Sequence, residues 1–265
     1  MSTDLLYDQP EVVIILVLFS FLVFAGELGY RAGRRGQPAQ MEAVRSQVNN
    51  IQTALLGLLA LLLGFSFAMA ISRFDNRKEM VVRESNAIGT VVLRARLLPT
   101  LQRAEVSEVL RRYIEARVEA ARRGSFPIPV QQELDAETRR LQDRLWLEAV
   151  AAAEADVRSV PAGLFIQAIN ELIDIKGAHD AALANHVPES VLLLLFGFAI
   201  LAVGVVGYGN GLVGARTSGV TVTLYVLIAL VILVIVDLDR PRRGLILVSQ
   251  ENMINLQQSV DLPKR

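Results

Sequence analysis

The amino-acid sequence predicts an all-α integral membrane protein with four transmembrane helices and a helical soluble insert between the second and third of them. Two observations predict this fold. Four apolar runs lie at 12–25, 51–71, 191–206 and 220–236, and each is long enough, with its apolar flanks, for a span of about 20 residues. The stretch between the second and third runs is polar and carries apolar residues at helical spacing.

The order of these runs predicts four domains: the first pair of transmembrane helices over 1–72, a helical extramembrane domain over 73–189, the second pair over 190–236, and a tail over 237–265. Acidic residues precede the first run where a signal peptide would be basic, so we expect this run to be retained as a span. Arginines and the sequence Gly-Gln-Pro at 36–38 then end the first helix.

Prolines divide the insert into helices. Breaks are predicted at Pro99, at 124–129, at Pro161 and at Pro188. Proline removes a backbone hydrogen-bond donor and disfavours the helical conformation of the residue before it. The expected helices are 73–97, 101–123, 131–158 and 162–186, the first of them continuous with the second span.

Composition excludes several classes of function. The net charge of zero gives no reason to expect nucleic-acid binding, and the absence of cysteine excludes disulfides and thiolate sites. No apolar run contains an ionisable residue, which argues against a proton-coupled transporter. His179 and His186 share a helical face but lack further metal ligands nearby. We therefore expect no enzyme, no cofactor and no metal site, and passive conduction, sensing or assembly remain.

Two stripes follow the second span at intervals of four residues. The small residues of one stripe would let another helix approach closely; they are Ala60, Gly64, Ala68 and Ser72. The bulky residues of the other stripe lie one position on, about 100° around the helix; they are Leu61, Phe65 and Met69. In a symmetric oligomer the small stripe would pack against neighbours, while the bulky stripe formed a hydrophobic constriction. Alternatively, the bulky stripe faces lipid or the core of the bundle.

The third span and the tail carry further candidates. Gly197, Gly204 and Gly211 recur every seven residues, which predicts tight helix packing. Beyond the last span, an acidic and basic run could bind a cation, line an ion entrance, pair with the insert or anchor the tail at the membrane surface. Its residues are Asp237, Asp239, Arg240, Pro241, Arg243 and Gly244. Arg73 and Arg77, after the second span, belong to a basic half of the insert that is either a solvated face or an anion-attracting vestibule.

Several of these segments resemble a known family. The run from Leu63 through Phe65 to Arg77 is similar to the end of the second membrane helix of bestrophins. A closer resemblance is to the bacterial bestrophin-like family of unknown function. It rests on Glu84–Ile88, on Leu97–Pro99 and on the Asp-x-Asp-Arg-Pro-x-Arg-Gly run over 237–244.

Bestrophins are pentameric anion channels whose hydrophobic neck is formed by residues of the second span spaced four apart. The resemblance places Gly57, Leu61 and Phe65 at this neck, with Met69 following, and glycine at the first position would widen it. The resemblance implies that the chain forms a homo-oligomer, a pentamer, in the lipid bilayer of the bacterial inner membrane. It also implies that this oligomer passes an ion, which in the bestrophins is an anion. The alternative is a non-conducting sensor or scaffold whose insert binds a partner or ligand. Positive charges flank both sides of the spans, so the side of the insert stays open.

Overall fold

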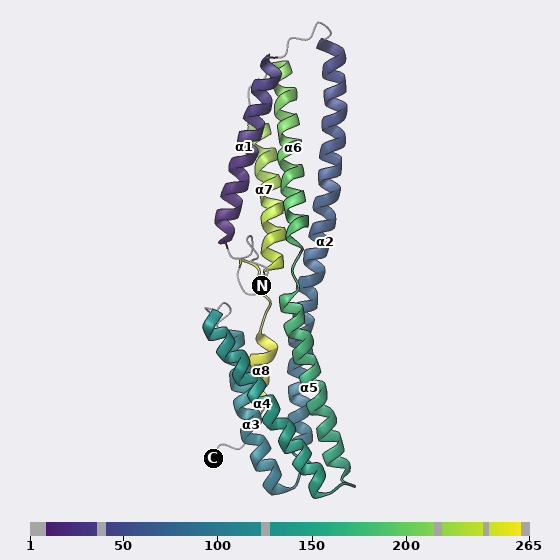
Figure 1. Ribbon diagram of the computed structural model, residues 1–265, viewed down its shortest axis with the longest axis vertical. Helices are drawn as coiled ribbons and strands as arrows, with labels where there is room; N and C mark the ends of the chain where they lie inside the picture. Colours follow the sequence, from purple (N-terminus) through teal and green to yellow (C-terminus); the bar gives the residue numbers. More distant parts are fainter. Residues whose placement is uncertain (1–8, 36–40, 123–127, 215–218, 241–243, 261–265) are drawn as a thin grey trace. The chain divides into compact units, whose positions relative to one another are not determined.

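The protein is described by a computed structural model over residues 9–35, 41–122, 128–214, 219–240 and 244–260 (Figure 1). Helices account for most of these described residues, and no strand occurs among them, so the predicted all-α class is confirmed. Four helical stretches of this part of the chain are long and apolar enough to cross a membrane: Val12–Arg35, Glu42–Ala95, Val160–Val213 and Gly219–Asp239. The third of them is interrupted at 185–188, between two separate helices. The predicted break at 36–38 lies outside the described residues, as does the predicted break at 124–129 except for residues 128 and 129, which already belong to the next helix.

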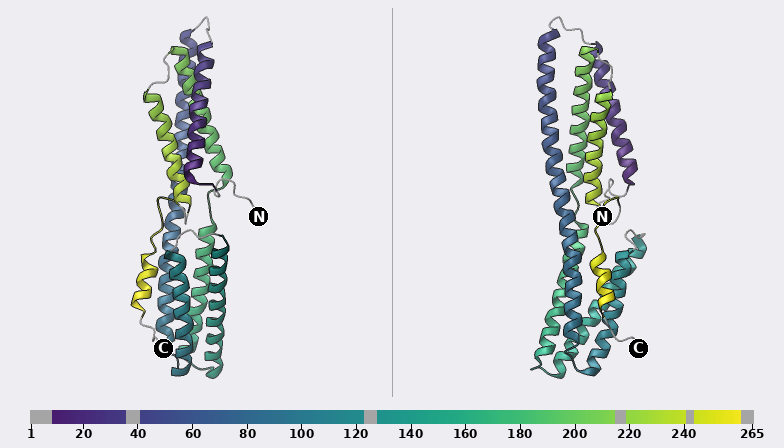
Figure 2. Two further views of the ribbon diagram at one scale, coloured as in Figure 1. Left: turned by 90° about the vertical axis from the view of Figure 1, so that its left-hand side faces the viewer. Right: turned by 180° about the vertical axis from the view of Figure 1, so that it is seen from behind.

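The chain forms two compact units. The first contains α1 (Glu11–Arg35), the beginning of α2 (Met41–Ala95), α6 (Glu189–Val213) and α7 (Gly219–Asp239). Figure 2 shows α1, α6 and α7 side by side, and α1 makes its closest contacts with α6. Buried leucines and isoleucines such as Leu22, Leu195 and Ile232 fill the space between these helices.

The second unit contains the rest of α2 together with α3 (Thr100–Arg122), α4 (Ile128–Ala155), α5 (Val160–Ala184) and α8 (Glu251–Ser259). Its helices enclose one hydrophobic core, which includes Ile88, Tyr113, Leu145, Phe165 and Leu172. The bounds of α3, α4 and α5 agree with the sequence expectation to within about three residues. The short helix α8 was not predicted; it contributes Met253 to the same core.

Local signals explain where these helices begin and end. Ser159 caps α5 by accepting a hydrogen bond from the backbone N–H of Ala162, and Pro161 occupies the first turn, where its missing N–H costs nothing. Gly214 ends α6 in the left-handed region at φ 77°, which glycine adopts without strain, and its N–H donates to Gly211. No comparable signal interrupts α2, which runs unbroken from the apolar stretch into the charged one.

Candidate functional site

The bulky stripe of α2 is exposed along most of its length. Leu61 is 53% exposed and Phe65 63% exposed, and a Cβ at Gly57 would meet no other element within 4 Å. Met69 is half-buried. The opposite face of the helix carries the buried residues Leu59, Ser66 and Ala70. Within the described chain, α2 therefore turns one face inward and leaves this apolar stripe uncovered.

The small stripe is also uncovered. Ala60, Gly64, Ala68 and Ser72 are all exposed, and a Cβ built at Gly64 would have no atom of another element within 4 Å. Within one chain, the described residues supply no helix that packs against this stripe. The two stripes of α2 thus form one continuous surface that a lipid or a second protein chain would cover.

Close packing through glycine occurs between α1 and α6. A Cβ at Gly207 would collide with the carbonyl oxygen of Gly26, and one at Gly211 with the carbonyl oxygen of Tyr30. Gly204 approaches the backbone of Ala25 more loosely, and Gly197 has no such neighbour within 4 Å.

The α1 partners of this contact were not singled out from the sequence. Gly26, Gly29 and Gly33 provide it, and a Cβ at Gly29 would collide with the carbonyl oxygen of Gly204. Their spacing of three and four residues, facing a second glycine-rich helix, was the signal available.

The two tail aspartates bind backbone groups. The Asp237 carboxylate accepts hydrogen bonds from the N–H groups of Leu245 (2.7 Å) and Ile246 (2.9 Å), which ties these two residues to the end of α7. The Asp239 carboxylate accepts from the N–H of Val187 at 2.7 Å, and the Nδ1–H of His186 donates to the Asp239 carbonyl oxygen at 3.0 Å.

The rest of the tail run is described only in part. Arg240 is buried, and Gly244 has φ 138°, a conformation that glycine tolerates best. Pro241 and Arg243 lie outside the described residues.

The two arginines after the second span differ in environment. Arg77 is almost fully buried, and its guanidinium donates to the carbonyl oxygens of Ala182 (3.2 Å) and Asn185 (2.8 Å), where a cation meets the negative end of α5. Arg73 is half-buried and continues the bulky stripe one turn past Met69. Its Nη1 is buried and has no hydrogen-bond partner among the described residues.

The second unit contains a buried ionic cluster that the sequence did not reveal. Nε of Arg117 donates to Glu84 Oε1 at 2.5 Å and Nη2 to Oε2 at 2.8 Å, while Nδ1 of His179 lies 2.5 Å from Oε2. Burial alone would raise the pKa of the Glu84 carboxyl, but the charge of Arg117 and the hydrogen bonds from His179 and Arg117 lower it from 4.5 to about 2. The carboxylate is therefore ionised and Nδ1 of His179 is the donor.

A polar cleft lies between α2 and α5 in the same unit. It has a volume of about 690 Å³, and it is lined by Arg83, Asn86, Thr90, Gln167, Asn170, Glu171 and Asp174, with Ala87 and Ile175. Its side chains can donate and accept hydrogen bonds and carry charges of both signs. This is the kind of surface that binds a polar ligand or a partner chain.

A family model described as the Bestrophin-like domain matches residues 16–253. Three structures of a bacterial bestrophin homologue from Klebsiella pneumoniae are similar. A tryptophan-to-alanine variant gives a TM-score of 0.67 at 16% identity, over 95% of this chain and 99% of that chain. An aspartate-to-alanine variant gives 0.66 at 17% identity, over 94% and 97%. The structure solved by zinc phasing gives 0.61 at 18% identity, over 93% and 98%.

No curated protein matches the chain. The family model nevertheless covers well over half of it. The chain therefore belongs to the bestrophin-like family, and it has the fold of the bacterial bestrophin homologues.

Proposed function

We propose that copies of this chain assemble into a homo-oligomeric ion channel, a pentamer in the bacterial inner membrane, and that α2 lines an anion-conducting pore. The observation that carries the proposal is the uncovered apolar surface of α2, in a chain of the bestrophin-like family. A helix that spans a membrane and presents both a small and a bulky stripe outward is suited to a ring of like helices. No catalytic role is proposed.

The narrow part of the pore is formed by Leu61 and Phe65. In a ring of α2 helices, each residue would contribute one apolar side chain per subunit at its own level, one helical turn apart. Rings of this kind impede ions by excluding water from the constriction. Gly57 opens the pore on one side of the constriction, and Met69 bounds it on the other.

Arg73 supports the preference for anions. It follows Met69 at the same four-residue interval, so it lies at the end of the pore-lining stripe, and it retains an unsatisfied N–H donor within the described chain. A ring of arginines at a pore entrance raises the local concentration of anions. Arg77 does not share this role, because its guanidinium is occupied by backbone carbonyls. In this proposal Asp237 holds the chain that follows α7, and Asp239 holds the segment that precedes α6.

The test is ion flux from liposomes that contain the purified oligomer, with chloride and potassium gradients compared. Phe65→Ala removes apolar bulk from the constriction, so we expect chloride flux to rise several-fold over wild type. Phe24→Ala is the matched control, because Phe24 is an equally exposed phenylalanine (60%) on α1. Equal flux through wild type and Phe65→Ala would remove Phe65 from the pore.

The polar cleft between α2 and α5 favours a second candidate function, a non-conducting sensor or scaffold. A correctly assembled wild-type oligomer that passes neither chloride nor potassium would favour this candidate. Its own test is thermal stability of the purified protein against a panel of small polar ligands. A shift that disappears in Asn170→Ala would place the ligand in the cleft.

A further inference from the structure

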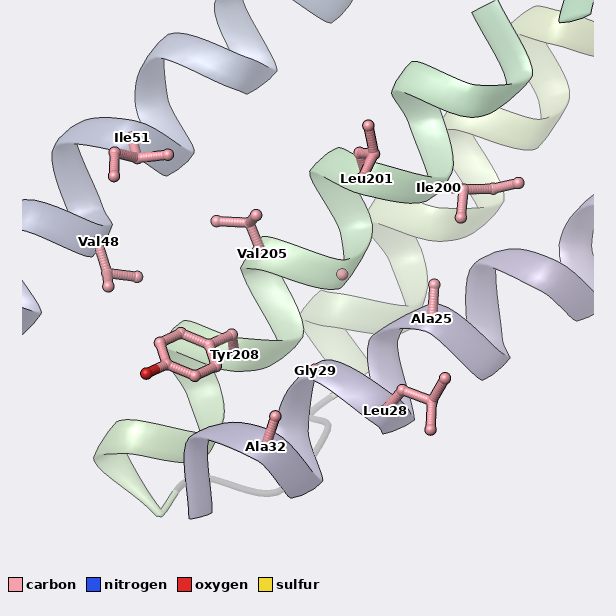
Figure 3. A pocket seen from close by; sticks show the side chains of 11 residues that line it. Ala25, Leu28, Gly29, Ala32, Val48, Ile51, Ile200, Leu201, Val205 and Tyr208 are labelled. Atoms are coloured by element: carbon pink, nitrogen blue, oxygen red, sulfur yellow. The ribbon is translucent and has the colours of Figure 1, made fainter. Parts of the chain in front are cut away.

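The first unit contains an apolar cavity of about 600 Å³ between α1, α2 and α6 (Figure 3). Figure 3 shows Val48 and Ile51 of α2 facing Val205 and Tyr208 of α6 across it. The Tyr208 hydroxyl is the only polar side-chain group among its lining residues. Water gains no hydrogen bonds in such a cavity, so in a bilayer an acyl chain is its natural occupant.

Arginines gather at one end of this cavity. On α1, Arg34 and Arg35 follow the lining residue Ala32, and on α2, Arg45 precedes the lining residue Val48 by one turn. The structure records no acidic partner for these three arginines within the described residues. A guanidinium binds a phosphate group through strong, often bidentate hydrogen bonds.

The guanidinium of Arg45 is held at this end of the cavity. Its Nη2 donates to the carbonyl oxygen of Leu212 at 2.9 Å, one turn of α6 beyond the lining residue Tyr208. Its Nε is buried and has no hydrogen-bond partner in the described part of the chain. A fixed cation with an unsatisfied donor therefore adjoins the apolar cavity.

We propose that this cavity binds an anionic phospholipid, with an acyl chain against α1, α2 and α6 and the phosphate at Arg45 and Arg34. The apolar cavity lies next to arginines that have no acidic partner among the described residues. In the same way, the acyl chains of an anionic phospholipid lie next to its phosphate. The proposal does not require that the protein conduct ions. Its success or failure is therefore independent of the proposed channel.

The test places a fluorescent reporter in the cavity. Trp146 is the only tryptophan of the sequence, so Trp146→Phe gives a silent background, and Tyr208→Trp then reports on the cavity alone. The protein is reconstituted with phospholipids brominated on their acyl chains, which quench tryptophan on contact. Leu194→Trp is the control reporter, because Leu194 is exposed on the same helix and is not a lining residue.

We expect the reporter at 208 to be half-quenched at a several-fold lower mole fraction of brominated phosphatidylglycerol than of brominated phosphatidylcholine. The reporter at 194 should show no such preference, and Arg45→Gln should abolish the preference at 208. Equal quenching by both lipids at 208 would overturn the proposal, because it would show that the reporter contacts the bulk bilayer without a preference for the anionic lipid. An absence of quenching at 208 would overturn it in favour of a protein helix in the cavity.

A measurement on the wild-type protein guards against misfolding of the variants. Native mass spectrometry from mixed micelles should show phosphatidylglycerol retained in preference to phosphatidylcholine, and this preference should be lost in Arg45→Gln. Arg94→Gln is a suitable control, because Arg94 lies in the second unit, where it donates to the carbonyl oxygen of Leu164. Equal retention of the two lipids by the wild-type protein would contradict the proposal.

Discussion

Glu84 shows how a single buried carboxylate depends on its neighbours. Its side chain has no exposure, and its carboxylate accepts charge-assisted hydrogen bonds from Arg117 and His179. Burying the charges of Glu84 and Arg117 is costly. The ion pair is tolerated because both oxygens of the Glu84 carboxylate accept hydrogen bonds. The cluster ties α2, α3 and α5 together within the second unit.

We expect Glu84→Gln to destabilise the folded protein by about 3–5 kcal/mol, because it leaves Arg117 charged and buried without its counter-charge. Chemical unfolding followed by circular dichroism measures this loss. Glu79→Gln is the matched control: Glu79 pairs with Arg83 at the surface, where both side chains are more than half exposed, and its removal should cost less than about 1 kcal/mol. Equal losses in the two variants would contradict the role given to the cluster.

The same carboxylate predicts an acid dependence. The folded-state pKa of Glu84 is lowered from 4.5 to about 2, so its contribution to stability is complete above pH 4.5 and is lost as the pH falls through 4.5 towards 2. The free energy of unfolding of the wild type should therefore decrease over this window. Glu84→Gln should lack this part of the slope; a difference between the two proteins that stays constant from pH 6 to pH 3 would refute the assignment.

At the scale of the elements, α1 and α6 are held together by backbone contact. Glycines on both helices remove the side chains that would otherwise separate them. Contacts of this kind favour helix association in a bilayer, where lipid tails are as apolar as leucine and the hydrophobic effect offers little.

Two alanine substitutions on α6 separate this packing from helix propensity. Alanine is the better helix former by about 1 kcal/mol, so Gly197→Ala, whose Cβ meets no other element, should be neutral or stabilising. Gly207→Ala should be destabilising, because its Cβ would collide with the backbone of Gly26. Thermal unfolding in detergent compares the two variants. Stabilisation by both would show that the helices are not in backbone contact.

The sequence was most informative about the elements whose signals are local. Proline and glycine mark the ends of α3, α5 and α6, and hydrophobicity marks the spans. The pairing of Glu84 with Arg117 was not predictable, because the two residues are 33 positions apart in the sequence and meet only through the packing of α2 against α3. Helix α8 was missed because it is short and has one buried residue, Met253.

The candidate surface on α2 was located from spacing alone, since two stripes whose residues recur every four positions can be read directly from the sequence. Spacing did not distinguish the exposed stripe from a buried one. The tail run was recognised as a motif, yet its chemistry depends on backbone N–H groups such as that of Val187, which no side-chain pattern encodes.

At the scale of the whole molecule, the uncovered surface of α2 predicts which substitutions disturb assembly of the oligomer. Gly64→Leu should prevent or alter oligomer formation by blocking close approach at the small stripe, while the single chain still folds, because no other element lies within 4 Å of this site. Light scattering of the purified protein gives the mass of the assembly. Gly64→Ala keeps the stripe small and should assemble normally; an unchanged mass for Gly64→Leu would show that the stripe is not a packing face.

The glycine contact between α1 and α6 also has a consequence for the timing of biosynthesis. Gly29 and Gly204 are about 175 residues apart in the sequence, and synthesis proceeds at roughly 5–20 residues per second. The glycine face of α1 therefore remains unpaired for about 9–35 s, until its partner helix has been made. During that interval the glycine face of α1 is open to capture by a wrong helix.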